Sequence, residues 1–256
     1  MAAIGFIGTG HIAAPMARAL ARAGHSVTVS ERNADVADAL VGAGLGIAKA
    51  ANQQVVDASD TVFLCLRPAV WNSVVTPLSF RSQQQIVSVM AGVALDDIAA
   101  TCAPVTRISA TIPYGYIENG GCPLPVGGEP SAVQALFGDR NPVLPQRSEA
   151  ALNVHFAAST MTSAALGQLI AATEWLADQT GDADAAEVYV ANLVSGFLAS
   201  LPKDAAGGLA RERAALATPD TLNLQMVEGL RDAGAFDSLG PVLSAILASM
   251  DPPENA

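Results

Sequence analysis

The clearest chemical signal in the sequence is a glycine-rich turn close to the N-terminus. Gly8, Gly10 and Ala13 follow a short apolar run in the pattern G-x-G-x-x-A. The first glycine permits a tight turn, the second lets a pyrophosphate approach the backbone, and the alanine lets a helix pack closely on the strand. A helix that begins here would present free N–H groups and a partial positive charge to the phosphates. We therefore predict a dinucleotide site formed by Gly8, Thr9, Gly10, His11 and Ile12.

Polar residues at the end of the next apolar run bear on the choice of cofactor. Glu31 lies about 20 residues beyond the glycines, where an acid binds the ribose 2′-hydroxyl of NAD. Ser30 and Arg32 make the opposite case, because a hydroxyl and a guanidinium suit the 2′-phosphate of NADP. We predict that Ser30, Glu31 and Arg32 all line the cofactor site, and we favour NADP over NAD.

The elements that would position these residues alternate along the first 110 residues. Short runs rich in Val and Ile predict strands, and the stretches between them predict helices. The predicted strands cover residues 4–8, 26–30, 61–66, 86–89 and 106–110, and the first two predicted helices cover residues 12–23 and 34–43. Nearly continuous apolar strands separated by helices indicate a parallel sheet that is covered on both faces. The expected fold class is α/β, with an N-terminal Rossmann-type doubly wound sheet.

The second part of the chain has a different pattern. Residues 113–145 are rich in Pro and Gly, which indicates loops and short edge strands. From residue 150 onward apolar residues recur at helical spacing, and helices are predicted at residues 156–176, 185–201, 209–216, 223–233 and 239–250. The first of these helices is apolar nearly all round, as in a bundle core or a subunit interface. We expect a dinucleotide-binding domain over residues 1–149 and an all-α dimerisation and substrate domain over residues 150–256.

Composition and charge exclude several classes of partner. The chain of 256 residues is 51% hydrophobic and 14% charged, which argues against disorder. Its 24 acidic residues outnumber its 13 Lys and Arg residues, and the net charge of −11 disfavours nucleic acid as a partner. The apolar windows are shorter than the ~20 residues of a membrane-spanning helix, and no export signal is evident. The three cysteines lack metal-ligand spacing, so we predict reduced thiols, no metal site and a cytoplasmic location.

Several of these segments together resemble the pyrroline-5-carboxylate reductase family, and the resemblance covers most of the chain. The opening GFIGTGHIA at residues 5–13 is similar to that family's first signature. The run FLCLRP at residues 63–68 looks like its strand end V-K-P, and residues 86–93 resemble its fifth strand and the glycine turn that follows. Residues 107–113 are similar to its R-x-M-P-N strand end, with Tyr114 in place of the asparagine. The resemblance implies further cofactor contacts from Leu66, Arg67, Pro68, Ala91 and Gly92.

The resemblance continues in the helical half. The run ATPDTLNLQ at residues 217–225 resembles the T-P-G-G-L-N-E-Q version of the family's substrate loop. Family members are dimers with an interlaced helical half, and this loop meets the nicotinamide of the partner subunit. Thr218 and Asn223 are thereby implied as catalytic residues that contact the substrate. Asp220 and Thr221 stand where the family has two glycines whose N–H groups face a substrate carboxylate, and Asp220 would repel that carboxylate.

These features predict an NAD(P)H-dependent oxidoreductase that transfers hydride to a small imine or carbonyl compound and acts as a homodimer. A protonated imine needs only a well-placed hydride donor, because its carbon is already electrophilic, whereas a ketone also needs a proton donor. Two alternatives stay open: an NADP-binding protein without turnover that serves as a sensor or scaffold, and a deazaflavin-dependent NADP reductase. Thr218, Asp220 and Thr221 have an alternative role, since any one of them could cap the helix that follows.

Overall fold

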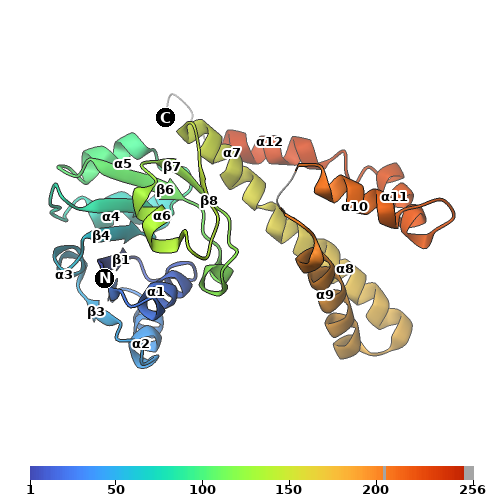
Figure 1. Cartoon of the computed structure of the whole chain (residues 1–256), viewed down its shortest axis with the longest axis horizontal. Coiled ribbons are helices and arrows are strands. Elements are labelled where there is room, and N and C mark those ends of the chain that lie inside the picture. Colours follow the sequence, from blue (N-terminus) through green and yellow to red (C-terminus); the bar gives the residue numbers. More distant parts are fainter. Residues whose placement is uncertain (204–205, 251–256) are drawn as a thin grey trace. The chain divides into compact units, whose positions relative to one another are not determined.

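The computed structural model of the chain describes residues 1–203 and 206–250. It forms two compact units (Figure 1). The first comprises residues 1–156 together with 249 and 250, and the second comprises residues 157–248. The boundary between them falls inside α7 (Glu149–Ser159).

A mostly parallel sheet forms the centre of the first unit. Its strands are β1 (Ala3–Ile7), β2 (Ser26–Ser30), β3 (Ala48–Ala50), β4 (Thr61–Leu64), β5 (Gln85–Ser88), β6 (Arg107–Thr111), β7 (Leu124–Gly128) and β8 (Val143–Pro145). They form one eight-stranded sheet in the order β3-β2-β1-β4-β5-β6-β7-β8. β1 to β6 run parallel, and β7 turns antiparallel to β6. The strand order reverses between β1 and β4, which confirms the predicted doubly wound, Rossmann-type fold.

Helices cover both faces of this sheet (Figure 1). One face packs against α1 (Ala13–Arg22), α2 (Ala34–Gly42), α6 (Ser131–Phe137) and the 3₁₀ turn η1 (Gly115–Asn119). The other face packs against α3 (Asn52–Asp57), α4 (Pro68–Val75) and α5 (Leu95–Thr101). Adjacent strand residues supply the two cores, since Phe6 and Phe63 stack at 4.9 Å on the first face while Ile7 and Leu64 face the second.

Three elements of the first unit depart from the sequence prediction. The strand predicted at residues 61–66 ends at Leu64, and Arg67 is extended before Pro68, which begins α4. Proline suits the first position of a helix because the N–H group that it lacks would have no partner there. The short strand β3 and helix α6 were not predicted, because β3 has only three residues and none of them is buried.

The second unit is all-helical, as predicted. It contains the end of α7, then α8 (Met161–Thr180), α9 (Ala183–Ser200), α10 (Gly208–Leu216), α11 (Leu222–Asp232) and α12 (Leu239–Met250). The helix predicted at residues 156–176 is two helices instead, α7 and α8, which meet at Thr160. The Thr160 hydroxyl donates to the Ala157 carbonyl at 2.7 Å, a local bond that competes with regular helix. No helix within the described residues has the length and apolar character needed to span a bilayer.

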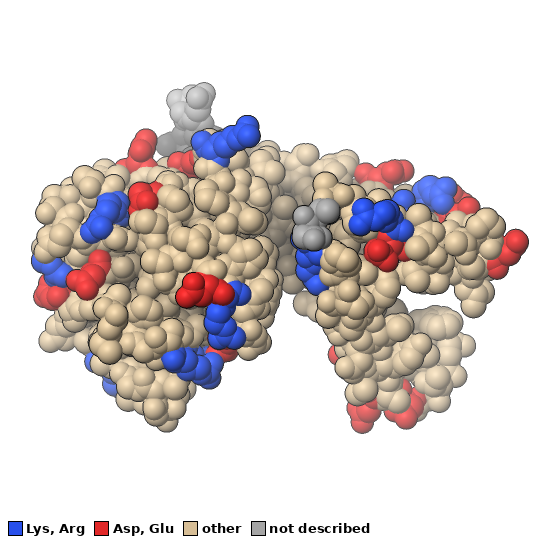
Figure 2. Space-filling view, in the orientation of Figure 1, with Lys and Arg blue, Asp and Glu red and all other residues tan. Residues whose placement is uncertain are grey.

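Helices α8 and α9 lie side by side (Figure 1). Together they expose a large apolar surface. Gly181 in the left-handed region (φ 73°) and Asp182, which accepts the Ala185 N–H, form the turn between them. Among the described residues of the second unit, only Ala157, Ala186 and Val190 are buried, whereas Trp175 is 65% exposed. Other large exposed apolar side chains on α8 and α9 are Leu166, Ile170, Val188, Tyr189, Leu193, Phe197 and Leu198. Uncharged residues dominate much of the visible face, and acidic residues gather near the connection of α8 and α9 (Figure 2).

Candidate functional site

The glycine turn lies between β1 and α1, where the order of the strands reverses. Gly8 has φ +91°, and a Cβ atom placed on it would lie 2.3 Å from the Cys65 carbonyl oxygen. Only glycine fits there, because both the backbone conformation and the neighbouring strand end exclude a side chain. A Cβ atom on Gly10 would meet no atom within 4 Å. Gly8 therefore shapes the turn, whereas Gly10 borders open space that a ligand can occupy.

Two buried hydroxyl groups hold this turn in place. The Gly8 N–H donates to Ser30 Oγ at 2.9 Å, and the Thr9 hydroxyl donates to the Ser30 carbonyl oxygen at 2.6 Å. Ser30 and Thr9 are both buried, so their hydroxyls orient the backbone that a phosphate would meet. Direct contact of either side chain with a cofactor remains a prediction.

Backbone donors are available at the start of α1. The Gly10 carbonyl accepts the Ala14 N–H at 3.0 Å, so the helical turn begins at the glycines. Among the described residues, no acceptor pairs with the N–H groups of Gly10, His11 and Ile12, and the first turn of α1 contains no acidic residue. Such donors, together with the helix dipole, suit an anion such as a phosphate. The exposed His11 stands beside them.

The other predicted cofactor residues follow neighbouring strands. Glu31 and Arg32 come directly after β2 and are exposed, Arg67 and Pro68 follow β4, and Ala91 and Gly92 follow β5. Leu66, at the exit of β4, is half-buried next to the Gly8 turn. Because β1, β2, β4 and β5 are parallel, their carboxyl ends meet at one edge of the sheet. The structure therefore gathers the predicted cofactor residues along one edge.

The predicted catalytic residues lie in the second unit, Thr218 in the loop between α10 and α11 and Asn223 in the first turn of α11. Thr218 and Asn223 are both exposed, and the Asn223 side-chain amide donates to the Leu216 carbonyl at 3.4 Å. Thr221 caps α11, since its hydroxyl accepts the Leu224 N–H at 3.2 Å and donates to the Thr218 carbonyl at 2.7 Å. Asp220 adopts φ +64°, a conformation that glycine takes more readily. The capping role is thus present for Thr221, and substrate contact by Thr218 and Asn223 stays a prediction.

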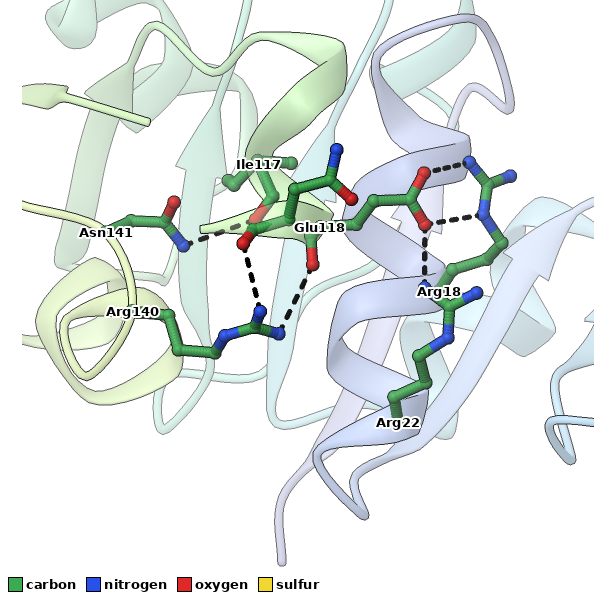
Figure 3. A network of polar contacts seen from close by, with 7 residues as sticks. Arg18, Arg22, Ile117, Glu118, Arg140 and Asn141 are labelled. Atoms are coloured by element: carbon green, nitrogen blue, oxygen red, sulfur yellow. Dashed lines mark hydrogen bonds and ion pairs between the residues drawn. The ribbon is translucent and has the colours of Figure 1, made fainter. Parts of the chain in front are cut away.

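Sequence reasoning missed an ion-pair cluster that joins α1 to η1 (Figure 3). The Glu118 carboxylate accepts Arg18 Nε at 2.9 Å, Arg18 Nη2 at 2.6 Å and Arg22 Nη1 at 2.8 Å. The hydrogen bond from Arg18 holds the pKa of Glu118 below its usual range. Arg18 and Arg22 are four residues apart on the predicted first helix, which places them on one face. Nothing in the sequence indicated that their partner comes from a turn about a hundred residues later.

The cysteines have the character of inert thiols. Cys65, Cys102 and Cys122 are free, and burial raises the pKa of Cys102 to about 12 and the pKa of Cys65 further still. Thiols that resist ionisation are poor nucleophiles and poor metal ligands. Within the described residues, no group of three His, Cys, Asp or Glu side chains is placed to hold a metal ion.

Fold and site together define a Rossmann-type α/β protein with an appended helical unit. Residues 3–92 match the family described as NADP oxidoreductase coenzyme F420-dependent. No curated protein matches the sequence of the chain.

Solved structures match nearly the whole length of the chain. One is pyrroline-5-carboxylate reductase from Streptococcus pyogenes, which is 19% identical, with 98% of each chain covered and a TM-score of 0.82. Pyrroline carboxylate reductase from Plasmodium falciparum, solved with NADP bound, is 11% identical, with 97% of each chain covered and a TM-score of 0.82. A reductive aminase from Aspergillus terreus, in complex with NADPH and ethyl-5-oxohexanoate, is 18% identical, with 98% of this chain and 92% of that chain covered and a TM-score of 0.64. The chain has the fold of these reductases, and the expected resemblance is confirmed at that level.

Proposed function

We propose that the protein is an NADP(H)-dependent oxidoreductase that reduces the C=N bond, or a related carbonyl group, of a small molecule. The observation that carries the proposal is the open space over Gly10 at the switch point of the sheet, next to unpaired backbone donors of α1. Solved relatives with this fold include reductases with NADP or NADPH bound, which supports the same cofactor here.

The residues of this chain have defined tasks in the proposal. The N–H groups of Gly10, His11 and Ile12 bind the pyrophosphate, and Arg32 pairs with the 2′-phosphate of NADP. The exits of β4 and β5, at Arg67 and Gly92, border the nicotinamide half. The cofactor supplies the hydride, so the protein needs only to hold the substrate carbon against it and to exclude water. Thr218 and Asn223 are proposed to hold the substrate.

We also propose that the protein is a cytoplasmic homodimer. The apolar side chains of α8 and α9 are too many for a water-facing surface, and a second copy of the chain would bury them. The resemblance to a family of dimers also supports a second copy of the chain as the partner of this surface. The buried thiols are compatible with a reducing compartment.

A specific observation favours each of two other functions. The family match at residues 3–92 favours a deazaflavin-dependent NADP reductase. Asp220 and Thr221, in place of the two loop glycines, favour a protein that binds NADP without turnover. The first proposal is favoured over both by the length of the helical unit and by the match to a pyrroline-5-carboxylate reductase over 98% of each chain.

One experiment separates these functions. NADPH is incubated with the protein and with separate cyclic imines, oxo acids with an amine, and an oxidised deazaflavin, and the nicotinamide absorbance is followed. Loss of absorbance with an imine is the expected result, whereas loss only with the deazaflavin supports the second function and binding without loss supports the third. Gly10→Val is the control, because a Cβ atom on Gly10 meets no atom within 4 Å and the added side chain is expected to enter the space of the cofactor.

A further inference from the structure

An open pocket of about 370 Å³ lies beside the glycine turn. It is lined by Gly10, His11, Ala14, Pro15, Arg18, Val36 and Gly115. Ligand pockets typically enclose roughly 300–1,000 Å³, so this one suits a phosphate group and its immediate neighbours better than a whole dinucleotide.

Arg18 is the permanently charged residue of this lining. It lies two turns along α1 from Gly10, and side chains on a helix lean toward the N-terminus of that helix. Its guanidinium can therefore face the same space as the backbone donors near Gly10. The rest of the lining includes the apolar residues Ala14, Pro15 and Val36, which bring no negative charge that would repel an anion.

Glu118 fixes the orientation of this guanidinium (Figure 3). The carboxylate binds Arg18 through Nε and Nη2, whereas Nη1 has no partner among the described residues. The turn that carries Glu118 is itself anchored, since Arg140 donates to the Glu118 carbonyl at 3.2 Å and to the Asn119 carbonyl at 3.0 Å. The same turn begins at Gly115, which lines the pocket. A guanidinium held in this way loses little rotational freedom when it binds an anion.

The surrounding charge also favours an anion. Arg18 and Arg22 share the single carboxylate of Glu118, so the cluster retains one positive charge. The whole chain has a net charge of −11, and a dinucleotide must therefore be attracted by local features of this kind.

We infer that Arg18 is a further cofactor-binding residue, which contacts a phosphate of the cofactor in this pocket, and that Glu118 is the positioning residue of its guanidinium. The inference rests on the proposed function for the source of the phosphate, which is either the pyrophosphate or the 2′-phosphate of NADP. In either case the bound group is a phosphate ester that lies next to the N-terminal turn of α1.

The test measures dissociation constants for NADPH, NADH and inorganic pyrophosphate, at several salt concentrations, with wild type and three variants. Arg18→Gln is expected to weaken NADPH binding roughly tenfold and to lower its salt dependence, because a charge-assisted hydrogen bond is lost. Arg22→Gln is the matched control, since Arg22 pairs with the same Glu118 one turn later but does not line the pocket, and its effect is expected to stay below about twofold. Arg18→Lys keeps the positive charge but lacks the planar guanidinium with its several N–H donors. An intermediate loss of NADPH affinity is therefore expected.

The three ligands distinguish the source of the phosphate. Equal losses for NADPH, NADH and pyrophosphate place the pyrophosphate in the pocket, whereas a loss for NADPH alone places the 2′-phosphate there. The inference is overturned if Arg18→Gln leaves all three constants unchanged, or if Arg18→Gln and Arg22→Gln weaken binding equally, which would mark Arg18 as purely structural. Arg18-dependent pyrophosphate binding without any nicotinamide binding would uphold the phosphate contact of Arg18 and refute the proposed function.

Discussion

At the scale of single residues, we propose that the choice between NADP and NAD depends on two exposed neighbours, Glu31 and Arg32. Neither makes a hydrogen bond or an ion pair with another described residue, so both are available to a ligand. Replacement of Arg32 by Ala should lower the preference for NADPH over NADH by about tenfold or more, because the partner of the 2′-phosphate is lost. The measurement is kcat/KM with each cofactor. Glu31→Gln should shift the ratio the other way, and an unchanged ratio in both variants would contradict the assignment.

Asp220 is the residue that should restrict the substrate. It holds a left-handed conformation and places a carboxylate where the resembling family has glycine. Asp220→Gly should raise kcat/KM for a cyclic imine that carries a carboxylate by roughly tenfold relative to a carboxylate-free analogue, because both the repulsion and the side chain are removed. Asp220→Asn removes the charge alone and separates the two effects. Equal changes for both imines would show that this loop does not face the carboxylate.

The sequence predicted local parts of the site and missed its long-range parts. The roles of Gly8 and Gly10 follow from their spacing, because a turn between strand and helix is a local structure. The hydrogen bond from the Gly8 N–H to the Ser30 hydroxyl was not predicted, and contact of Ser30 with a cofactor stays a prediction. The pairing of Arg18 with Glu118 was not predictable, because it depends on how η1 packs on α1.

At the scale of elements, the cluster around Glu118 should stabilise the packing of η1 on α1. The Glu118 side chain is only 18% exposed, which places its ion pairs between exposed pairs and fully buried pairs. Glu118→Gln should lower the free energy of unfolding at pH 7 by about 1–2 kcal/mol. Asp38→Asn breaks the exposed pair with Lys49 and should cost less than about 1 kcal/mol. Urea denaturation measures both, and equal effects would contradict the role of burial.

This contribution should depend on pH in a defined direction. Arg18 lowers the pKa of Glu118 in the folded protein, so the carboxylate binds protons less readily there than in the unfolded chain. The stabilisation is therefore full above the ordinary carboxyl pKa of about 4.3 and is lost as the pH falls through the lower, folded value. The difference in unfolding free energy between wild type and Glu118→Gln should shrink in that range. A difference that grows toward acidic pH would contradict the ion pairs.

The predicted elements match best where periodicity is strong. The predicted strand at residues 26–30 coincides with β2, and the predicted helix at 239–250 coincides with α12. Features with few buried residues were not predicted. They include the strand β3 and the break between α7 and α8. Their positions depend on neighbouring elements and on single side chains such as Thr160, which periodicity does not report.

At the scale of the whole molecule, the exposed apolar helices predict self-association. Ile170 and Trp175 on α8 are exposed in the single chain, so charged substitutions there should leave the fold of one copy intact. The double change Ile170→Glu, Trp175→Glu should convert a dimer into a monomer, as measured by sedimentation at several protein concentrations. Glu174→Lys on the same helix alters charge at a polar position and should preserve the dimer. A wild-type protein that sediments as a monomer would refute the proposed assembly.

In the proposed function, the first unit holds NADPH so that its hydride reaches a small imine. The most direct measurement uses NADPH deuterated at the transferring position of nicotinamide C4, with a cyclic imine as acceptor and mass spectrometry of the product. The expected product of the wild-type protein is an amine with one deuterium on the former imine carbon, and Gly10→Val should not produce it. An imine that is never reduced, while NADPH binds to wild type and Gly10→Val alike, would contradict both the chemistry and the place of the cofactor.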